Sequence, residues 1–548
     1  MARPEITVGR GTVYTNRGMV CSISPLAASA GIGVLRDGGN AFDAAIATAA
    51  AECVTVPHSC GFGGETFALM YHAGTGRTYG ISGSGKAPLA ANRDLFIAGG
   101  HKFLPSEGPL APSIPGEVDA YASILERFGT RSLDSLLQPA IRYAEEGFPL
   151  SPRLARGFGD ALDKLNRYTD TARVFTRNGE AYRAGDILVQ KNLAETLGRI
   201  ARDGAEEFYQ GETAREIVRS LQDAGGLFTL DEFARHETEW YEPPIATEYR
   251  GYTVYETAPP SQGFMLLEML NILEGFDLAG MEFYSAEAVH AMVEAKKLAF
   301  ADRNAYMGDP KFVSAPVDEL ISKDFADRRR RLISPDRVLS SVEAGPVAAP
   351  VPGDGDTSYL CVVDGEGNAV SFIHSLFHGF GSGFVAGTTG IVLNDRTGSG
   401  LSLVEGHPNV VEPGKRTMHT LNAYMVFQGK KPYLIGGTPG GDRQVQWNAQ
   451  VIANVLDYGM DPQEAVEAPR WVSMPGTDPR DFDDPFTLET ESGMAPEEAE
   501  KLRALGHQLS DAPPEGLGGS TKLIMVDGDS SVRTGGSDPR TDGHAAAL

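Results

Sequence analysis

The sequence predicts a layered α/β or α+β fold, because strand-like segments adjoin long helix-like segments on both sides of one flexible tether. Residues 343–356, EAGPVAAPVPGDGD, form this tether, which is rich in Pro, Gly and Ala and shows no hydrophobic periodicity. Amphipathic helical runs dominate before it, and short alternating strands become frequent after it. The tether therefore divides the 548 residues into a helix-rich part, 1–356, and a second part, 357–548.

Residues 26–56 predict two helices. Gly38-Gly39 suits the end of the first helix, since glycine readily adopts the left-handed conformation found there. Asn40 suits the N-cap of the second helix, whose Ala-rich run spans Phe42–Glu52.

Hydrophobic periodicity extends the pattern along the chain. Residues 115–330 are mostly helical by pattern, with amphipathic runs at 116–128, 133–146, 191–203 and 285–307. Strand-like segments occur at 66–71 (after the glycine loop 59–64), 357–364, 368–377, 390–394, 419–428 and 432–436. The turn Asp364–Gly367 predicts a hairpin between two of these strands, and a helix is expected at 442–457.

Composition narrows the class of partner. The formal net charge of −25 argues against nucleic acid and anionic membrane surfaces as partners. No stretch approaches the ~20 apolar residues of a membrane span. The first residues, MARPEITVGRGTVYTNRG, do not form a secretory signal, so a cytoplasmic protein is expected.

Sequence motifs predict no metal and no cofactor. The four cysteines form no C-x-x-C pair, and the eleven histidines form no H-E-x-x-H pattern. The glycine loops 379–383 and 437–441 lack the Gly-Lys-Ser/Thr of a phosphate loop and the G-x-G-x-x-G of a dinucleotide fold.

The junction Asp356-Thr357 suggests a chain that cuts itself. A threonine hydroxyl is a weak nucleophile, but an N-terminal threonine carries its own base, an α-amine with a pKa of about 7.7–8.0. Attack of the Thr357 hydroxyl on the Asp356 carbonyl, followed by ester hydrolysis, would release that amine. The alternative is an ordinary loop-to-strand junction.

Gly437-Thr438-Pro439-Gly440-Gly441 lies between a predicted strand and a predicted helix. Backbone N–H groups at a helix N-terminus carry partial positive charge, which suits an oxyanion hole. A tight turn without catalytic role would produce the same pattern.

Taken together, the motifs resemble the γ-glutamyltransferase family of N-terminal nucleophile hydrolases, over nearly the whole chain. The matching segments follow one order: Gly38–Ala41, 61–64, Pro115-Gly116, Pro259–Ser261, 301–303, 308–310, Asp356-Thr357, 381–383, Gly440-Gly441 and Ser537–Arg540.

This resemblance implies a four-layer αββα sandwich and cleavage before Thr357 into two fragments that form a heterodimer, with further dimerisation left open. It also implies an acyl-enzyme on Thr357 that is released to water or an amine. Ser375 matches a family threonine whose hydroxyl supports the nucleophile, and Gly440 and Gly441 match the oxyanion-hole glycines.

The chain departs from the family where the glutamyl group is held. Family members usually carry an arginine in the segment matching 82–88, which here contains Lys86, and an asparagine where Phe377 stands. A glutamine and an aspartate match Arg396 and Ser399, and two serines match His419-Thr420. Loss of the aspartate removes the partner of an ammonium group, whereas an added arginine suits a carboxylate.

The segments 406–409, 414–416 and 419–422 resemble a divergent branch that includes cephalosporin acylases and an oxamate amidohydrolase. We therefore expect an N-terminal threonine amidohydrolase whose small acyl group bears a carboxylate, bound by Arg396 with Lys86 or His419. A structural ion pair is the alternative role for Arg396. The alternative functions are γ-glutamyl hydrolysis or transfer on glutathione-like compounds, and an uncleaved protein that only binds a small metabolite.

Overall fold

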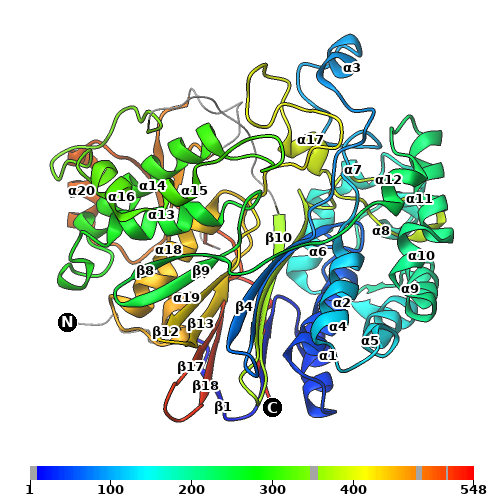
Figure 1. Cartoon of the computed structure of the whole chain (residues 1–548), viewed down its shortest axis with the longest axis horizontal. Helices are drawn as coiled ribbons and strands as arrows, with labels where there is room; N and C mark the ends of the chain where they lie inside the picture. Colours follow the sequence, from blue (N-terminus) through cyan, green and yellow to red (C-terminus); the bar gives the residue numbers. More distant parts are fainter. Residues whose placement is uncertain (1–8, 346–355, 477–483, 514–515) are drawn as a thin grey trace.

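The computed structural model describes residues 9–345, 356–476, 484–513 and 516–548; residues 346–355 of the predicted tether lie outside this part. The described residues form two seven-stranded antiparallel sheets (Figure 1). The first sheet has the order β1 (Val13–Thr15), β18 (Arg533–Ser537), β17 (Lys522–Val526), β13 (Lys431–Gly437), β12 (Tyr424–Gln428), β9 (Tyr252–Glu256), β8 (Ile245–Tyr249). The second has the order β19 (His544–Ala547), β2 (Met19–Ser22), β10 (Asp356–Val363), β11 (Ala369–Phe377), β3 (Glu65–His72), β4 (Arg77–Ser82), β7 (Glu239–Tyr241).

The two sheets share a buried apolar core. Tyr359 and Cys361 of β10 join Met425 of β12 and Ile435 of β13 in one cluster. The intervening residue Leu360 belongs to a different cluster, on the opposite face of β10. This alternation is the two-residue period of a strand buried on both faces.

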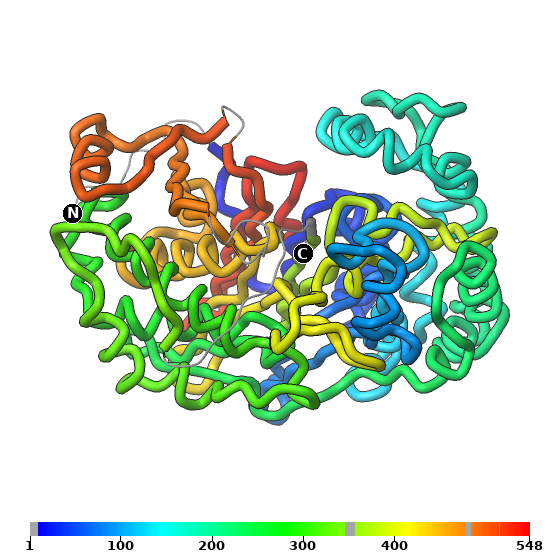
Figure 2. Tube along the Cα trace, turned by 90° about the horizontal axis from the view of Figure 1, so that it is seen from above, coloured from blue at the N-terminus to red at the C-terminus, as the bar shows by residue number. Residues whose placement is uncertain are grey.

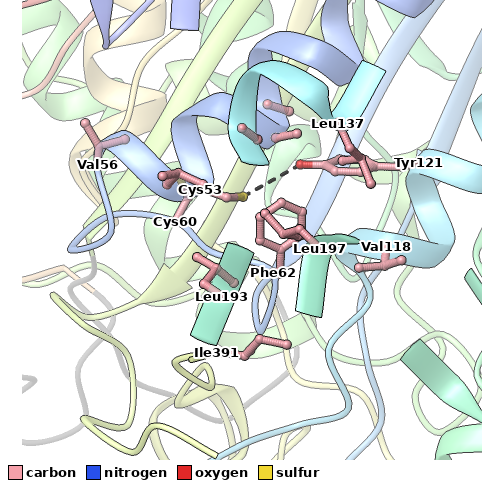
Figure 3. Close-up of a cluster of buried hydrophobic side chains, with 14 of the residues drawn as sticks. Cys53, Val56, Cys60, Phe62, Val118, Tyr121, Leu137, Leu193, Leu197 and Ile391 are labelled. Carbon is pink, nitrogen blue, oxygen red and sulfur yellow. Dashed lines mark hydrogen bonds between the residues drawn. The ribbon is translucent and has the colours of Figure 1, made fainter. Parts of the chain in front are cut away.

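Helices cover the outer faces of both sheets. On the second sheet lie α1 (Pro25–Arg36), α2 (Ala41–Thr55) and α4 (Glu117–Phe128), and α5 (Leu133–Glu146) and α9 (Lys191–Asp203) pack outside these helices. Figure 3 shows part of this packing, where Cys53 of α2 approaches Tyr121 of α4. On the first sheet lie α13 (Gly263–Leu273), α14 (Ala286–Tyr306) and α18 (Arg443–Leu456).

Shorter elements complete the described chain. The helices are α3 (Arg93–Ala98), α6 (Pro152–Asp160), α7 (Leu162–Leu165), α8 (Thr169–Phe175), α10 (Ala205–Tyr209), α11 (Glu212–Asp223), α12 (Leu230–Ala234), α15 (Val317–Leu320), α16 (Lys323–Arg330), α17 (Arg396–Gly400), α19 (Pro462–Glu467) and α20 (Pro496–Leu505). The remaining elements are two 3₁₀ turns, η1 (Leu278–Gly280) and η2 (Gly387–Thr389), and the strands β5 (Phe148–Pro149), β6 (Ile187–Leu188), β14 (Trp471–Met474), β15 (Thr487–Thr490) and β16 (Gln508–Asp511).

The local predictions around residues 26–56 are confirmed. Asn40 caps α2, its side chain accepting from the N–H groups of Phe42 and Asp43, and the Asp43 side chain returns a bond to the Asn40 N–H. The predicted hairpin at Asp364–Gly367 is also present, with β10 and β11 paired antiparallel. The helices α4, α5, α9 and α14 match the amphipathic runs within a residue at most ends.

One sequence expectation, the strand at 390–394, is wrong, and another, the mostly helical region 115–330, is correct but incomplete. Residues 390–394 do not form a strand. They form isolated bridges, such as that between Val385 and Val392, because the segments opposite them are irregular loops. The mostly helical region 115–330 also contains β8 and β9, which extend the first sheet beside β12.

The two ends of the chain meet in the structure. The early strand β1 pairs with β18, and the last strand, β19, pairs with β2. In Figure 2 the blue and red segments accordingly lie side by side near the centre of the molecule. Each sheet thus combines strands from 1–356 and 357–548, so the two parts share both sheets. Among the described helices, none has the length and apolarity needed to cross a bilayer.

Candidate active site

Thr357 lies at the start of β10, where the strand pairing is irregular. Asp356, described by its backbone pairing, faces Phe377, and Ser358 faces His374, so the register shifts at Thr357. Such a bulge turns a side chain away from the regular pleat. Thr357 is 1% exposed, and its hydroxyl donates to the Ser375 hydroxyl over 3.4 Å.

Ser375 and Gln444 orient the Thr357 hydroxyl. The Ser375 oxygen also accepts from the Phe377 N–H at 2.7 Å, which fixes the position of the serine. The Gln444 amide donates to the Thr357 oxygen over 3.5 Å from the first turn of α18. Sequence reasoning found Ser375 through a family match, but it missed Gln444, whose one local signal is its place three residues after Gly441.

The Gly440-Gly441 turn faces the same space as Thr357. Both glycines have positive φ angles, +134° and +54°. A β-carbon on Gly440 would lie 2.6 Å from the Trp447 ring, so only glycine fits there. No hydrogen bond joins the N–H of either glycine to another described residue. Two N–H donors without acceptors, at the N-terminus of a helix, can stabilise an oxyanion.

A buried ion pair holds this turn in place. Arg303 of α14 donates to Asp442, the residue after the two glycines, at 2.6 Å. Both side chains are 1% exposed. The Gln262 side chain donates to the Gly441 carbonyl at 3.4 Å, which leaves the N–H side of the turn open. The segment 301–303 thereby connects to the site through the oxyanion turn.

Arg396 begins α17 and is completely buried. Its guanidinium lies 4.3 Å from the centre of the Phe377 ring, and its Nε lies 3.4 Å from Glu65. Neither Nη atom has a hydrogen-bond partner in the described structure. Burial lowers the pKa of Arg396 to about 10, so the group stays charged at neutral pH. The Arg396 guanidinium and the Phe377 ring therefore lie against each other.

Glu65, which sequence reasoning missed, links Arg396 to His419. Burial opposes ionisation of Glu65, but His419, Arg396 and the Ser113 hydroxyl together hold its pKa below the usual value. His419 Nε2 lies 2.9 Å from Glu65 and 2.7 Å from the Ser84 hydroxyl. Burial and the charge of Arg396 lower the pKa of His419 to about 4, so this histidine is neutral at pH 7.

The other predicted binding residues are dispersed. The Thr420 hydroxyl is buried near His419 and has no partner among the described residues. The Ser399 hydroxyl donates to Asp395 at 3.0 Å. Lys86 is half-buried and forms a backbone bridge with Arg416. Burial, together with the nearby Arg416 and Lys311, lowers the pKa of Lys86.

A second buried cluster lies behind Thr357. His374 Nδ1 is 2.7 Å from Glu117, and its Nε2 is 2.8 Å from Glu52. Burial alone would lower the pKa of His374, but Glu117 and Glu52 raise it well above the usual value. The Ser358 hydroxyl donates to Glu52 at 2.6 Å. This network ties Ser358, the residue after Thr357, to helix α2.

Two groups have a spacing compatible with a metal ion: Cys53, Cys60 and His374, and His290, Glu294 and His507. In the first, both histidine nitrogens already bond carboxylates. In the second, His290 Nδ1 and His507 Nε2 lie 2.8 Å apart, and Lys297 donates to Glu294 at 2.7 Å. The histidines of both groups are thus engaged by protein partners, and the first group belongs to the cluster behind Thr357.

A cavity of about 510 Å³ opens at Thr357. Thr357, Pro439 and Gly440 line it on one side. The end of α2, the start of α1, helix α6 and the loop 516–520 complete the wall. The hydroxyl and the oxyanion turn thus meet a space large enough for a substrate.

The family model described as gamma-glutamyltranspeptidase matches residues 27–548. The chain belongs to the gamma-glutamyltranspeptidase family. One relative, the glutathione hydrolase-like YwrD proenzyme of Bacillus subtilis (strain 168), is 40% identical over 542 residues, which cover 98% of this chain and 99% of the relative. Another, the acylase ACY 1 proenzyme of Pseudomonas sp. (strain SE83), is 33% identical over 99% of this chain and 96% of its own.

A solved structure is also similar to this member of the gamma-glutamyltranspeptidase family. The cephalosporin acylase from Bacillus halodurans superimposes with a TM-score of 0.91 and 37% identity, covering 100% of this chain and 98% of the other. The chain is therefore an enzyme of a family that contains hydrolases and transferases. The term proenzyme is part of the names of the two relatives.

Proposed function

We propose that this chain is a self-processing amidohydrolase with Thr357 as its N-terminal nucleophile. The observation that carries the proposal is the position of the Thr357 hydroxyl, 3.4 Å from Ser375 in a cavity shared with Gly440. In this proposal the two sheets and their helices are the αββα sandwich of the N-terminal nucleophile hydrolases. The fragments 1–356 and 357–548 remain together as a heterodimer, in the cytoplasm.

Each step of the proposed reaction uses groups near Thr357. In the precursor, the hydroxyl attacks the Asp356 carbonyl, the peptide nitrogen leaves as the Thr357 amine, and water hydrolyses the ester. In the mature enzyme, this amine takes the hydroxyl proton while the oxygen attacks the substrate amide. The N–H groups of Gly440 and Gly441 stabilise the oxyanion. The proton passes to the departing amine, and water then hydrolyses the acyl ester.

Arg396 supports an acyl group that bears a carboxylate. Its two Nη atoms have hydrogens to donate and no described acceptor, and a carboxylate would satisfy both in a two-pronged contact. The Asp395 carboxylate beside it is already occupied by His378 and Ser399, so it is poorly placed to receive an ammonium group.

One observation favours the second candidate, γ-glutamyl hydrolysis or transfer. Glu65 lies 3.4 Å from Arg396, so both signs of charge occur in one buried place. The α-ammonium and α-carboxylate groups of a γ-glutamyl substrate would match these two charges. The relative named as glutathione hydrolase-like adds weight to this candidate. We rank it second because the single charge of Glu65 is already paired with Arg396.

A denaturing gel tests self-processing. The purified wild type should give bands of the sizes expected for 1–356 and 357–548, and Thr357→Ala should remain one band. Thr75→Ala serves as the matched control and should cleave normally, because it removes an exposed threonine hydroxyl in the turn between β3 and β4. A wild type that stays full-length after long incubation would show that the chain is an uncleaved binder.

Three substrates then separate the acyl groups: a glutaryl anilide, a γ-glutamyl anilide and oxamate. The glutaryl compound has the carboxylate-bearing chain without the ammonium group. We expect the highest kcat/KM on the glutaryl anilide. If the γ-glutamyl anilide is turned over best, Glu65 and Arg396 bind an amino acid end and the second candidate is correct.

A further inference from the structure

A second cavity, which we call the hairpin cavity, lies at the far end of β10 from Thr357. It is found where the turns β3–β4, β10–β11 and β17–β18 meet the start of β13. Its wall includes Val363, the last residue of β10. Because Thr357 lies near the start of the same strand, the two residues are roughly 20 Å apart, at about 3.3 Å per residue. No described residue lines both cavities.

Arg533 of β18 brings a buried positive charge to the wall of the hairpin cavity. It is 2% exposed, and its guanidinium forms no ion pair with a described residue. The two Nη atoms donate to the backbone carbonyls of Ser531, Asp364 and Gly365 over 2.7 to 3.3 Å. The Nε atom has no hydrogen-bond partner among the described residues. Buried charges in proteins are normally paired and hydrogen-bonded, so this guanidinium has one bond and one charge left to satisfy.

The carboxylate of Asp364 acts on Arg533 electrostatically, but its oxygens are committed elsewhere. They accept from the backbone N–H groups of Ala41, Glu366 and Asn368 and from the Asn368 side chain. Burial lowers the pKa of Arg533, and Asp364 opposes this change. Arginine keeps its proton in proteins even so. The described chain therefore offers no acceptor to Arg533 Nε, and a bound anion would supply one.

Tyr71 of β3 is a second hydrogen-bond donor in the wall. It is 8% exposed, and its hydroxyl forms no hydrogen bond with a described residue. Burial raises the pKa of Tyr71, so the hydroxyl keeps its proton at neutral pH. The space around these donors is small, about 290 Å³, and part of its wall is apolar, formed by Val363, Ala369 and Val526. A short aliphatic chain fits such a wall.

The exposed part of the wall limits the charge of a ligand. Lys431 is exposed and forms no ion pair with a described residue, whereas Glu366 and Asp527 are exposed carboxylates. Asp527 accepts from the N–H groups of Asp529 and Ser530, which hold its carboxylate in the β17–β18 turn. A ligand with a second negative charge would meet these two carboxylates. One negative charge on an apolar body matches the cavity better than two.

We propose that the hairpin cavity binds a small aliphatic monocarboxylate. Its carboxylate accepts from Arg533 Nε and the Tyr71 hydroxyl, and its chain lies against the apolar part of the wall. Lys431 adds a positive charge nearby. The site is separate from Thr357 and does not depend on the proposed reaction, so its ligand is distinct from the substrate.

Isothermal titration calorimetry with pentanoate tests this site. The reference protein is the full-length chain with Thr357→Ala and Arg396→Gln, because it lacks the carboxylate contact proposed at Arg396. Pentanoate should bind once per chain. Glutarate, which adds a carboxylate to the other end of the same five-carbon chain, should bind about tenfold more weakly. Pentylammonium, which reverses the charge, should not bind.

Four further substitutions in the reference protein locate the site. Arg533→Gln should abolish pentanoate binding, and Tyr71→Phe should weaken it about fivefold by removing one hydrogen bond. Lys431→Gln should weaken it about threefold, since an exposed charge contributes less. Lys430→Gln is the matched control, because it removes the neighbouring exposed lysine that does not line the cavity. Its Kd should equal that of the reference protein.

Arg533→Gln also removes the bonds to three carbonyls, so Tyr71→Phe decides the test if that variant does not fold. The inference is overturned by a reference protein that does not bind pentanoate, by a preference for glutarate or pentylammonium, or by an unchanged Kd in the deciding variant. Self-cleavage and amide turnover are measured on protein with Thr357 in place. The proposed function therefore stands or falls independently of this site.

Discussion

Two buried histidines near Thr357 face glutamates, yet their protonation differs. His374 lies between Glu52 and Glu117, and these raise its pKa well above the usual value. His419 lies beside Glu65, but burial and the neighbouring charge of Arg396 lower its pKa to about 4. At neutral pH the first histidine is therefore charged and the second is neutral.

The difference separates a structural cluster from the cluster that we propose binds the substrate. Both nitrogens of His374 are bonded to carboxylates, and Glu52 also bonds Ser358 next to Thr357. In the other cluster the positive charge belongs to Arg396, whose Nη atoms bond no described residue. A charge with its bonds complete holds the fold in place, whereas a buried charge with bonds to spare is suited to receive a ligand.

Replacing His374 should have the largest effect of the changes considered. His374→Met leaves two buried glutamates without their partner, and we expect a loss of about 3–5 kcal/mol in the free energy of unfolding. Urea unfolding in the uncleaved Thr357→Ala background measures it. His544→Met, at an exposed strand position, should change it by less than about 0.5 kcal/mol. A His374 variant as stable as its control would show that this cluster does not support the fold.

Replacing Arg396 should affect substrate more than the fold, because Glu65 keeps its contacts with His419 and the Ser113 hydroxyl. Arg396→Gln should lower kcat/KM on a glutaryl anilide about 10²-fold, since it removes a charged two-pronged contact. The chain should still cleave itself. A butyryl anilide, which lacks the carboxylate, provides the comparison and should lose little. If the variant instead loses stability as His374→Met does, with both substrates affected equally, Arg396 is a structural ion-pair residue.

Local sequence signals predicted the parts of the site that depend on local geometry. The Asn40 cap, the β10–β11 hairpin and the glycines at 440–441 each follow from residues close together in the chain. Gly440 is the clearest case, because its φ of +134° and the nearby Trp447 ring both exclude a side chain. Here the backbone conformation itself selects the residue type.

Long-range pairing could not be predicted in the same way. Glu52 and His374 are 322 residues apart in the sequence, and Gln444 and Thr357 are 87 apart. A glutamate in a helix otherwise rich in alanine gives no sign of its partner. The strands β8 and β9 in the region 115–330 were missed for the same reason, since the pair joins the sheet through β12, on the far side of the tether. Such contacts depend on topology.

The two histidines also predict opposite pH limits to stability. The unfolded chain binds protons on His419 below about pH 6.5 and the folded chain only near 4, so stability is lost as pH falls through this range. His374 binds its proton more tightly when folded, so its contribution is full below 6.5 and is lost as pH rises through its raised pKa. Urea unfolding of Thr357→Ala against pH measures both limits. His419→Gln should weaken the decline between about pH 6.5 and 4, and His374→Gln should weaken the alkaline decline. The opposite pattern would reverse the assignment of charge to the two histidines.

The smallest effect is expected at Ser399, which the sequence placed among the substrate-binding residues. Its hydroxyl donates to Asp395 at 3.0 Å and lies 3.3 Å from His378 Nδ1. Ser399→Ala removes one hydrogen bond to a carboxylate that keeps its bonds from His378, so a loss of about 1 kcal/mol in stability is expected. The kcat/KM on the glutaryl anilide should stay within about twofold, because the hydroxyl is already engaged by protein. A tenfold fall with unchanged stability would instead place Ser399 against the acyl group, and the binding cluster would then extend from Arg396 along α17.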